Sequence, residues 1–141
     1  MAKRRKKVQA YLDALIYPLG DTGYERVEER PLADLELWKD HRRLTVFYHK
    51  GFECANPKCN NVGTRLIKGS DFGGNMHWDV YTDDLVLMTV DHIIPLSKGG
   101  SDDLRNKNPM CRPCNTAKSN KIQPQYLTED VDTDVDNSIL A

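Results

Sequence analysis

The stretch VDHIIPLSKGG, residues 90–100, places an aspartate and a histidine side by side where an apolar run gives way to a loop with a proline and two glycines. Two adjacent ionisable groups are unfavourable at the end of a buried strand, because moving each from water into the protein interior costs free energy. Asp91 and His92 are therefore either a turn cap and a surface histidine, or groups placed there for chemistry. Since neighbours in a strand point to opposite faces, both can serve one ligand only if the chain bends at the strand end.

The residues around this stretch predict two strands, a loop and a helix. MHWDVYT, residues 76–82, and LVLMTVDH, residues 85–92, are strand-like runs separated by two aspartates, which favours an antiparallel hairpin. The second run is apolar at nearly every position up to residue 90, so we expect cover on both faces. A polar SDD sequence then suits the start of a helical turn, and NTAKSNKI opens with Asn115, a residue favoured near helix starts.

Four cysteines occur in two close pairs, Cys54 and Cys59 in CANPKC, and Cys111 and Cys114 in CRPC. Each pair matches one half of a tetrahedral Zn²⁺ site. Disulfides and four unrelated buried thiols are the alternatives, and the sequence lacks the secretion signal that would favour disulfides. A site with four thiolates leaves no position for water or substrate, so zinc is expected to be structural and to hold the two pairs together.

The rest of the chain predicts one small domain with appendages. Its 141 residues and 39% hydrophobic content suffice for one modest core. Helical spacing predicts helices over residues 4–17 and 31–44, while residues 19–30 are expected to form a loop and residues 64–68 a short strand.

We divide the chain into three parts. Residues 1–49 form a basic N-terminal segment with a helical extension, residues 50–122 the functional domain, and residues 123–141 an acidic tail that is disordered by composition. The basic start either contacts phosphates or is simply solvated, and the tail either aids solubility or competes with nucleic acid. No apolar stretch reaches the roughly 18 residues of a membrane span, so we expect a soluble, cytoplasmic protein without membrane contact.

The sequence DHIIPLSKGGSDDLRNKNPMCRPCNTAKSNK, residues 91–121, resembles the core of the HNH endonucleases, the ββα-metal nuclease group, and KGFECANPKC extends the resemblance upstream to residue 50. The resemblance implies an α+β fold in which an antiparallel hairpin is followed by a helix. It also implies that Asp91 and Asn115 bind one catalytic divalent ion, that Asn106 fixes the loop, and that His92 is the base. A wide first cysteine pair and a long segment before the hairpin depart from the common pattern.

The chemistry of these residue types agrees with the implied roles. Hydrolysis of a phosphodiester needs a base to activate water and a cation to neutralise developing charge. A histidine can accept a proton near neutral pH, and the oxygens of Asp91 and Asn115 suit Mg²⁺ or Mn²⁺. Without imidazole at residue 115, softer ions are expected to serve less well.

The sequence therefore predicts a metal-dependent endonuclease or nickase acting on DNA, with double-stranded DNA as the expected partner and a monomer as the simplest state. By analogy, such small proteins are found in phages, mobile elements and restriction systems, in bacterial or phage-infected cells. The alternatives are a non-cleaving zinc module that binds nucleic acid or protein, and an effector that reads modified bases and cuts. Four basic residues either contact the nucleic-acid backbone or are merely solvated: Lys98, Arg112, Lys118 and Lys121.

Overall fold

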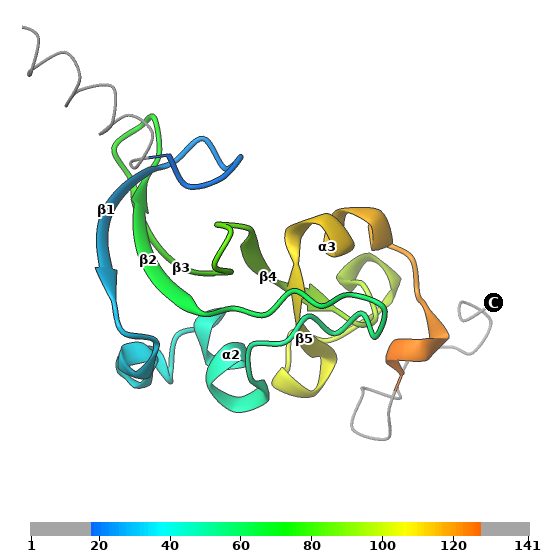
Figure 1. Cartoon of the computed structure of the whole chain (residues 1–141). Coiled ribbons are helices and arrows are strands. Elements are labelled where there is room, and N and C mark those ends of the chain that lie inside the picture. Colours follow the sequence, from blue (N-terminus) through cyan, green and yellow to red (C-terminus); the bar gives the residue numbers. More distant parts are fainter. Residues whose placement is uncertain (1–17, 128–141) are drawn as a thin grey trace, which may run out of the picture.

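A computed structural model describes residues 18–127, which contain a five-stranded antiparallel sheet in the order β1-β2-β3-β4-β5 (Figure 1). The strands are β1 Glu25–Arg30, β2 Arg65–Ser70, β3 Met76–Tyr81, β4 Leu87–His92 and β5 Lys107–Cys111. The α-helices are α2 Leu44–Lys50 and α3 Arg112–Lys118, and the 3-10 helices are η1 Leu32–Trp38, η2 Leu96–Lys98, η3 Leu104–Asn106 and η4 Pro124–Tyr126. The predicted α+β class is confirmed. None of these helices is long and apolar enough to cross a membrane.

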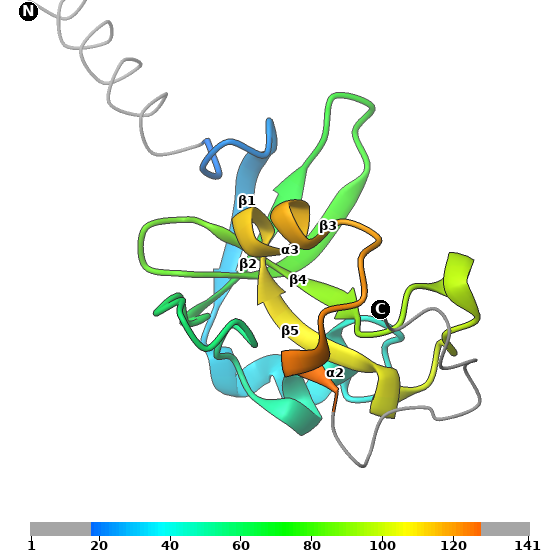
Figure 2. The same cartoon turned by 90° about the vertical axis from the view of Figure 1, so that its right-hand side faces the viewer.

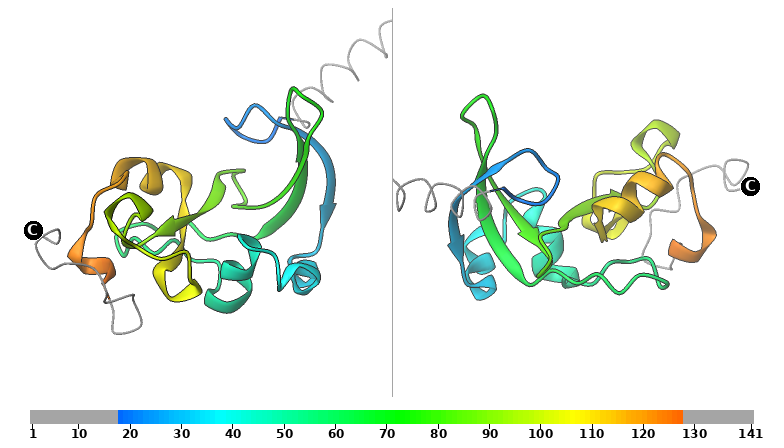
Figure 3. Two further views of the ribbon diagram at one scale, coloured as in Figure 1. Left: turned by 180° about the vertical axis from the view of Figure 1, so that it is seen from behind. Right: turned by 45° about the horizontal axis from the view of Figure 1, so that its top comes forward.

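The pairing between strands is shortest between β3 and β4. Strand β2 pairs with β3 at six positions, but β3 pairs with β4 only through Val80 with Met88 and Tyr81 with Leu87. Strand β4 then pairs with β5 at five positions. Both views in Figure 3 accordingly show β1, β2 and β3 on one side of the molecule and β4, β5 and α3 on the other. The last three elements form a compact strand–strand–helix unit.

The predicted hairpin over residues 76–82 and 85–92 is confirmed as β3 and β4, and the predicted strand over residues 64–68 is β2. Strand β5, however, was missed, and it rather than β3 forms the long pairing with β4 beside α3. Its central Pro109 has no N–H for a ladder and argues against an interior strand. The structure accommodates this proline because β5 is at the edge of the sheet, where Pro109 accepts a hydrogen bond from Ala55 N at 2.9 Å.

Residues 19–30, predicted as a loop, contain β1 at the opposite edge of the sheet. The sequence ERVEER lacks the apolar alternation of a half-buried strand, and four of its six residues are exposed. Ion pairing across the edge supports it, since Arg65 of β2 holds Glu29 at 2.6 Å. An edge strand stabilised by charges in this way gives little signal in a hydrophobic pattern.

The single helix predicted over residues 31–44 is wrong. The chain forms η1, turns, and begins α2 at Leu44. His41 explains the restart, because its Nδ1 accepts hydrogen bonds at 3.2 Å from the backbone N–H groups of both Arg43 and Leu44. The side chain thus satisfies donors that a helix start leaves without partners. Helix α3 likewise begins earlier than expected, so that Asn115 lies within it rather than at its start.

Figure 2 shows α2 and α3 on opposite sides of the β4–β5 pair. Leu44 and Phe47 of α2 pack with Met88 and Met110 of these strands in the main core. Strand β4 is less covered than its apolar sequence suggested, since Met88 is its one buried apolar residue. Tyr126, within the predicted tail, is also buried in this core. The helix predicted over residues 4–17 and the acidic residues from 128 onward lie outside the described residues.

Candidate active site

Strand β4 presents its last side chains to opposite faces, because residues alternate along a strand. Thr89 and Asp91 face α3, where they contact Asn115 and Lys118. His92 lies on the other face, toward the segment before α2. Both Asp91 and His92 pair regularly with β5, and the chain bends only at the next two residues. The bend predicted at the end of the strand is therefore confirmed, and it lies directly after His92.

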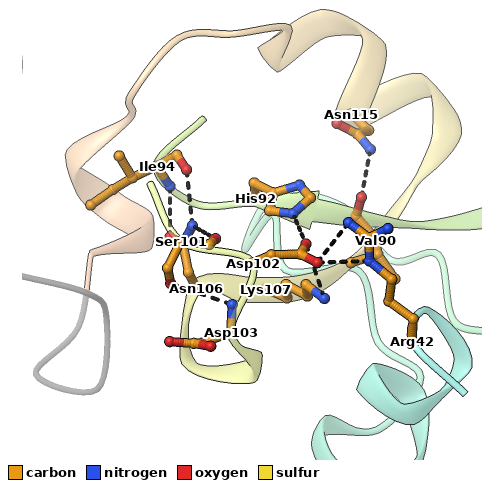
Figure 4. Close-up of polar contacts among 10 residues, drawn as sticks. All are labelled: Arg42, Val90, His92, Ile94, Ser101, Asp102, Asp103, Asn106, Lys107 and Asn115. Carbon is orange, nitrogen blue, oxygen red and sulfur yellow. Dashed lines mark hydrogen bonds and ion pairs between the residues drawn. The ribbon is translucent and has the colours of Figure 1, made fainter. Parts of the chain in front are cut away.

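His92 is held by a cluster of charged side chains (Figure 4). Its Nε2 lies 2.8 Å from Oδ1 of Asp102, and Lys107 Nζ lies 3.2 Å from the same oxygen. The other oxygen, Oδ2, accepts a hydrogen bond from Nε of Arg42 at 2.7 Å and lies 2.7 Å from Nη2 of the same ion-paired guanidinium. The hydrogen bonds from His92, Arg42 and Lys107 hold the pKa of Asp102 well below its usual range. The carboxylate therefore stays ionised at neutral pH and offers the imidazole a fixed acceptor.

Asn106 closes the loop that follows His92. Its Oδ1 accepts a hydrogen bond from Ile94 N at 2.9 Å, while its Nδ2 donates to Ile94 O at 2.9 Å and to Ser101 O at 2.7 Å (Figure 4). The side chain is fully buried. Gly100 permits this closure, because a Cβ at that position would lie 1.8 Å from Ile94 O. The structure thus brings Asn106 to the loop-fixing position that the sequence resemblance implied.

Asp91 is buried between β4 and α3. Lys118 Nζ lies 3.1 Å from its Oδ1 and also donates to the backbone oxygens of His92 and Ile93, at 3.2 Å and 3.4 Å. Within the described part of the chain, Asp91 Oδ2 is buried without a hydrogen-bond partner. Burial raises the pKa of Asp91, and the charge of Lys118 opposes that rise. A buried carboxylate oxygen without a donor is costly unless a cation or a proton satisfies it.

Asp91, His92 and Asn115 line a common pocket of about 270 Å³ at the end of β4. Asn115 Nδ2 donates to Thr89 Oγ1 at 2.8 Å. It also approaches Val90 O at 3.5 Å (Figure 4), and these two contacts leave the amide oxygen for a ligand. The partnerless carboxylate oxygen and this amide oxygen are hard donors of the kind that Mg²⁺ and Mn²⁺ prefer. The donor set on this pocket therefore fits a hard divalent cation.

A second pocket, of about 450 Å³, adjoins His92 on its other side. Its lining includes His41, Arg42, Arg43 and Lys107, together with His92. His92 thus lines both the pocket that carries the oxygen donors Asp91 and Asn115 and a pocket with several basic side chains.

The four cysteines converge, although two of them precede β2, Cys111 ends β5 and Cys114 lies in the first turn of α3. Their sulfurs all lie within 4.8 Å of one another, with Cys111 3.7 Å from Cys54 and 3.8 Å from Cys59. Four thiolates around Zn²⁺, each with a bond of about 2.3 Å, are expected at about 3.8 Å from one another. Backbone N–H groups of Cys111 and Asn61 also point to sulfurs, at 3.4 Å. The cluster therefore fits a tetrahedral metal ion.

Burial raises the pKa of Cys54 to about 12. Burial also raises the pKa of Cys114, so these two thiols resist ionisation unless a cation balances their charge. The donor chemistry thus agrees with the distances, since a divalent ion would supply that balance.

The four residues predicted to contact a nucleic-acid backbone differ in their exposure to solvent. Lys118 is 2% exposed and paired with Asp91, so its prediction as a phosphate contact is wrong. Its three acceptors on β4 and the following turn explain the burial. Arg112 and Lys121 are exposed and Lys98 is half-buried, and Arg112 also lies 3.5 Å from Asp21. Those three remain predictions.

Sequence reasoning missed the residues that surround His92. Asp102 was interpreted only as part of a helical turn, and Arg42 as part of a predicted helix. Arg42 is 60 positions from its partner Asp102, so no local pattern connects the two. A signal for Asp102 does exist in the sequence, because it is an acid ten residues after His92 in a loop that must fold back toward β4.

Comparison with protein-family models gives one match: residues 79–121 match the model described as HNH endonuclease. The matched segment contains Asp91, His92, Asn106 and Asn115, but not Arg42 or the first cysteine pair. Neither the curated proteins nor the solved structures gave a match. Residues 79–121 are thus similar to HNH endonuclease domains, a type generally associated with nuclease activity, and they contain two of the four cysteines that could hold a metal ion.

Proposed function

We propose that the protein is a divalent-metal-dependent endonuclease that hydrolyses phosphodiester bonds in DNA, with His92 as the general base. The observation that carries the proposal is the pocket on which Asp91, His92 and Asn115 converge, with a buried Asp91 oxygen that lacks a partner. That combination places a proton acceptor next to hard oxygen donors, which is what phosphodiester hydrolysis requires.

In this proposal His92 accepts a proton from a water as the water oxygen attacks phosphorus. The bond from phosphorus to the leaving oxygen breaks, that oxygen takes up a proton from solvent water, and His92 later releases its proton to solvent. Asn106 keeps the loop after His92 closed through its contacts to Ile94 and Ser101. A Mg²⁺ or Mn²⁺ ion held by Asp91 and Asn115 would supply charge neutralisation at the phosphate.

Lys118 has a positioning part in this scheme. It neutralises one oxygen of Asp91 and ties the carboxylate to the backbone after β4, so the other oxygen stays directed at a cation. Its buried ammonium also fixes α3 against the strand end. The distance between Asp91 and Asn115 across the pocket then depends on this contact.

The four cysteines are proposed to hold a structural Zn²⁺. Two thiols from residues 54–59 and two from residues 111–114 would fasten the segment before β2 to the start of α3. Because α3 carries both Asn115 and Lys118, the zinc would fix the helix that completes the catalytic pocket. It would not take part in the reaction, since four protein ligands fill its coordination sphere.

The finer biological assignments are also proposals. Double-stranded DNA is the expected substrate, and one catalytic pocket per chain most simply nicks one strand. The setting would be the cytoplasm of a bacterial or phage-infected cell, in a phage, mobile-element or restriction role. Lys98, Arg112 and Lys121 are the remaining candidates for contacts with the DNA backbone.

Incubation of zinc-loaded, full-length protein with supercoiled plasmid tests the proposal. Nicking is expected with Mg²⁺ or Mn²⁺ and not with EDTA, and it should be slower with Ni²⁺ because no imidazole coordinates the ion. His77→Ala is a matched control for His92→Ala, since His77 Nε2 also contacts an aspartate, Asp71, at 3.0 Å, but lies outside the pocket. DNA binding without nicking under every condition would replace the endonuclease with the non-cleaving zinc module.

A further inference from the structure

We infer that Asp102 is a positioning residue that fixes the tautomer and orientation of His92, and that Arg42, from outside the HNH-matching segment, holds Asp102 in place. The catalytic consequence of this inference rests on the proposed function, but the tautomer itself does not. Nothing in the family match assigns a role to Arg42, which is separated from the matched residues by α2 and β2.

The geometry gives Asp102 a single arrangement. One oxygen receives His92 Nε2 at 2.8 Å and Lys107 Nζ at 3.2 Å, and the other receives two nitrogens of the Arg42 guanidinium at 2.7 Å. Four donors on two oxygens leave the carboxylate little freedom to rotate. Arg42 and Lys107 therefore set the direction of the hydrogen bond between Asp102 and the imidazole.

A carboxylate flanked by two cations is an acceptor only. The nitrogen of His92 that faces it must then carry a proton, which places the hydrogen on Nε2 and leaves the lone pair on Nδ1. The low pKa of Asp102 supports this, because its strongest causes are the hydrogen bonds from His92 and Arg42. Nδ1 is thus the atom that accepts the proton from water.

Arg42 reaches Asp102 because its neighbours fix the backbone on both sides. His41 accepts two backbone N–H groups at the start of α2, as described above. Arg43 donates to Trp78 O at 3.2 Å and forms an ion pair with Asp79 on β3. With both neighbours anchored, the chain directs Arg42 into the pocket beside His92.

The cost of removing Arg42 is expected to fall on function rather than on folding. Its side chain is 76% exposed, and an exposed ion pair contributes little to stability. The ion pair of Arg42 is therefore expected to add little to the free energy of unfolding. As the support of Asp102 it limits the motion of a group that contacts the proposed base, and loss of such outer partners typically lowers activity 10- to 100-fold, by analogy with metal sites.

Nitrogen NMR of protein labelled with ¹⁵N-histidine tests the tautomer directly, at a pH where the His92 resonances report the neutral ring. The wild type is expected to carry the proton on Nε2 of His92, and Asp102→Ala to show a mixture of the two tautomers. Asp71→Asn is the matched control, because it alters the partner of His77 and should leave His92 unchanged. A wild-type proton on Nδ1, or the same tautomer in Asp102→Ala, would overturn the inference.

Plasmid nicking by the same variants tests the consequence. Asp102→Ala is expected to lower kcat at least tenfold with little change in KM, and Arg42→Ala to lower it less, with partial recovery in Arg42→Lys. Equal loss in kcat and DNA affinity for Arg42→Ala would instead make it a substrate contact and contradict the inference. If the wild type does not cleave DNA, the endonuclease proposal fails while the NMR result still decides the role of Asp102.

Discussion

Substitution of Asn106 tests whether the loop after His92 is held as the structure indicates. In Asn106→Ala the buried N–H of Ile94 loses its acceptor, and the backbone oxygens of Ile94 and Ser101 each lose a donor. An unsatisfied buried polar group costs about 1–3 kcal/mol, so for this set of lost hydrogen bonds we expect a loss of about 2–4 kcal/mol. That is a large share of the roughly 5–15 kcal/mol that stabilises a typical domain.

Urea unfolding of the zinc-loaded protein, followed by circular dichroism, measures this loss. Asn106→Asp keeps the shape and the acceptor but sets a charge against two carbonyl oxygens in a fully buried site, so it should lose at least as much. Asn108→Ala, two residues along on β5, is the control and should change stability by less than about 0.5 kcal/mol. A loss below about 0.5 kcal/mol for Asn106→Ala would refute the assigned hydrogen-bond network.

Three other predictions concern metal, charge and pH. Cys111→Ser should abolish bound zinc by metal analysis and lower the midpoint of thermal unfolding, because ligand loss is coupled to folding; full zinc content would contradict the site. Lys118→Met should cost about 3–5 kcal/mol in urea unfolding by leaving Asp91 unpaired, with Lys121→Met as the exposed control; equal effects would contradict the buried pair. The pKa of Asp102 is lower in the folded protein than in the unfolded chain, so the ionised carboxylate stabilises the fold. The wild type should therefore be more stable than Asp102→Asn above about pH 4, and this difference in unfolding free energy should decline on further acidification. A difference that grows toward pH 3 would contradict this sign.

The sequence predicted the centre of the fold better than its edges. Strands β3 and β4 were found from apolar runs and an intervening polar turn, which depend only on local sequence. Strands β1 and β5 were missed because each is at an edge of the sheet, one supported by charges and the other interrupted by Pro109. Edge strands bury little and pair on one side, so neither periodicity nor composition identifies them.

The site residues were likewise predicted only in part. Asp91, His92 and Asn115 were identified, and the structure brings them to one pocket, because they lie close to the cysteine pairs and the strand end in the sequence. Arg42 and Asp102 were not, since their contact depends on how the segment before α2 packs against the loop after β4. The charge of Lys118 predicts a surface position, whereas the side chain is buried against three oxygen acceptors from β4 and its turn.

The central claim, that His92 is the base of a metal-dependent nuclease, is tested most directly by one comparison of rates. At saturating protein and with Mg²⁺, the nicking rate of supercoiled plasmid should fall by about 10²–10⁴ from wild type to His92→Ala, the range typical of a lost general base. His77→Ala should retain the wild-type rate, and all three proteins should bind the plasmid equally. A His92→Ala variant that nicks as fast as the wild type would contradict the claim.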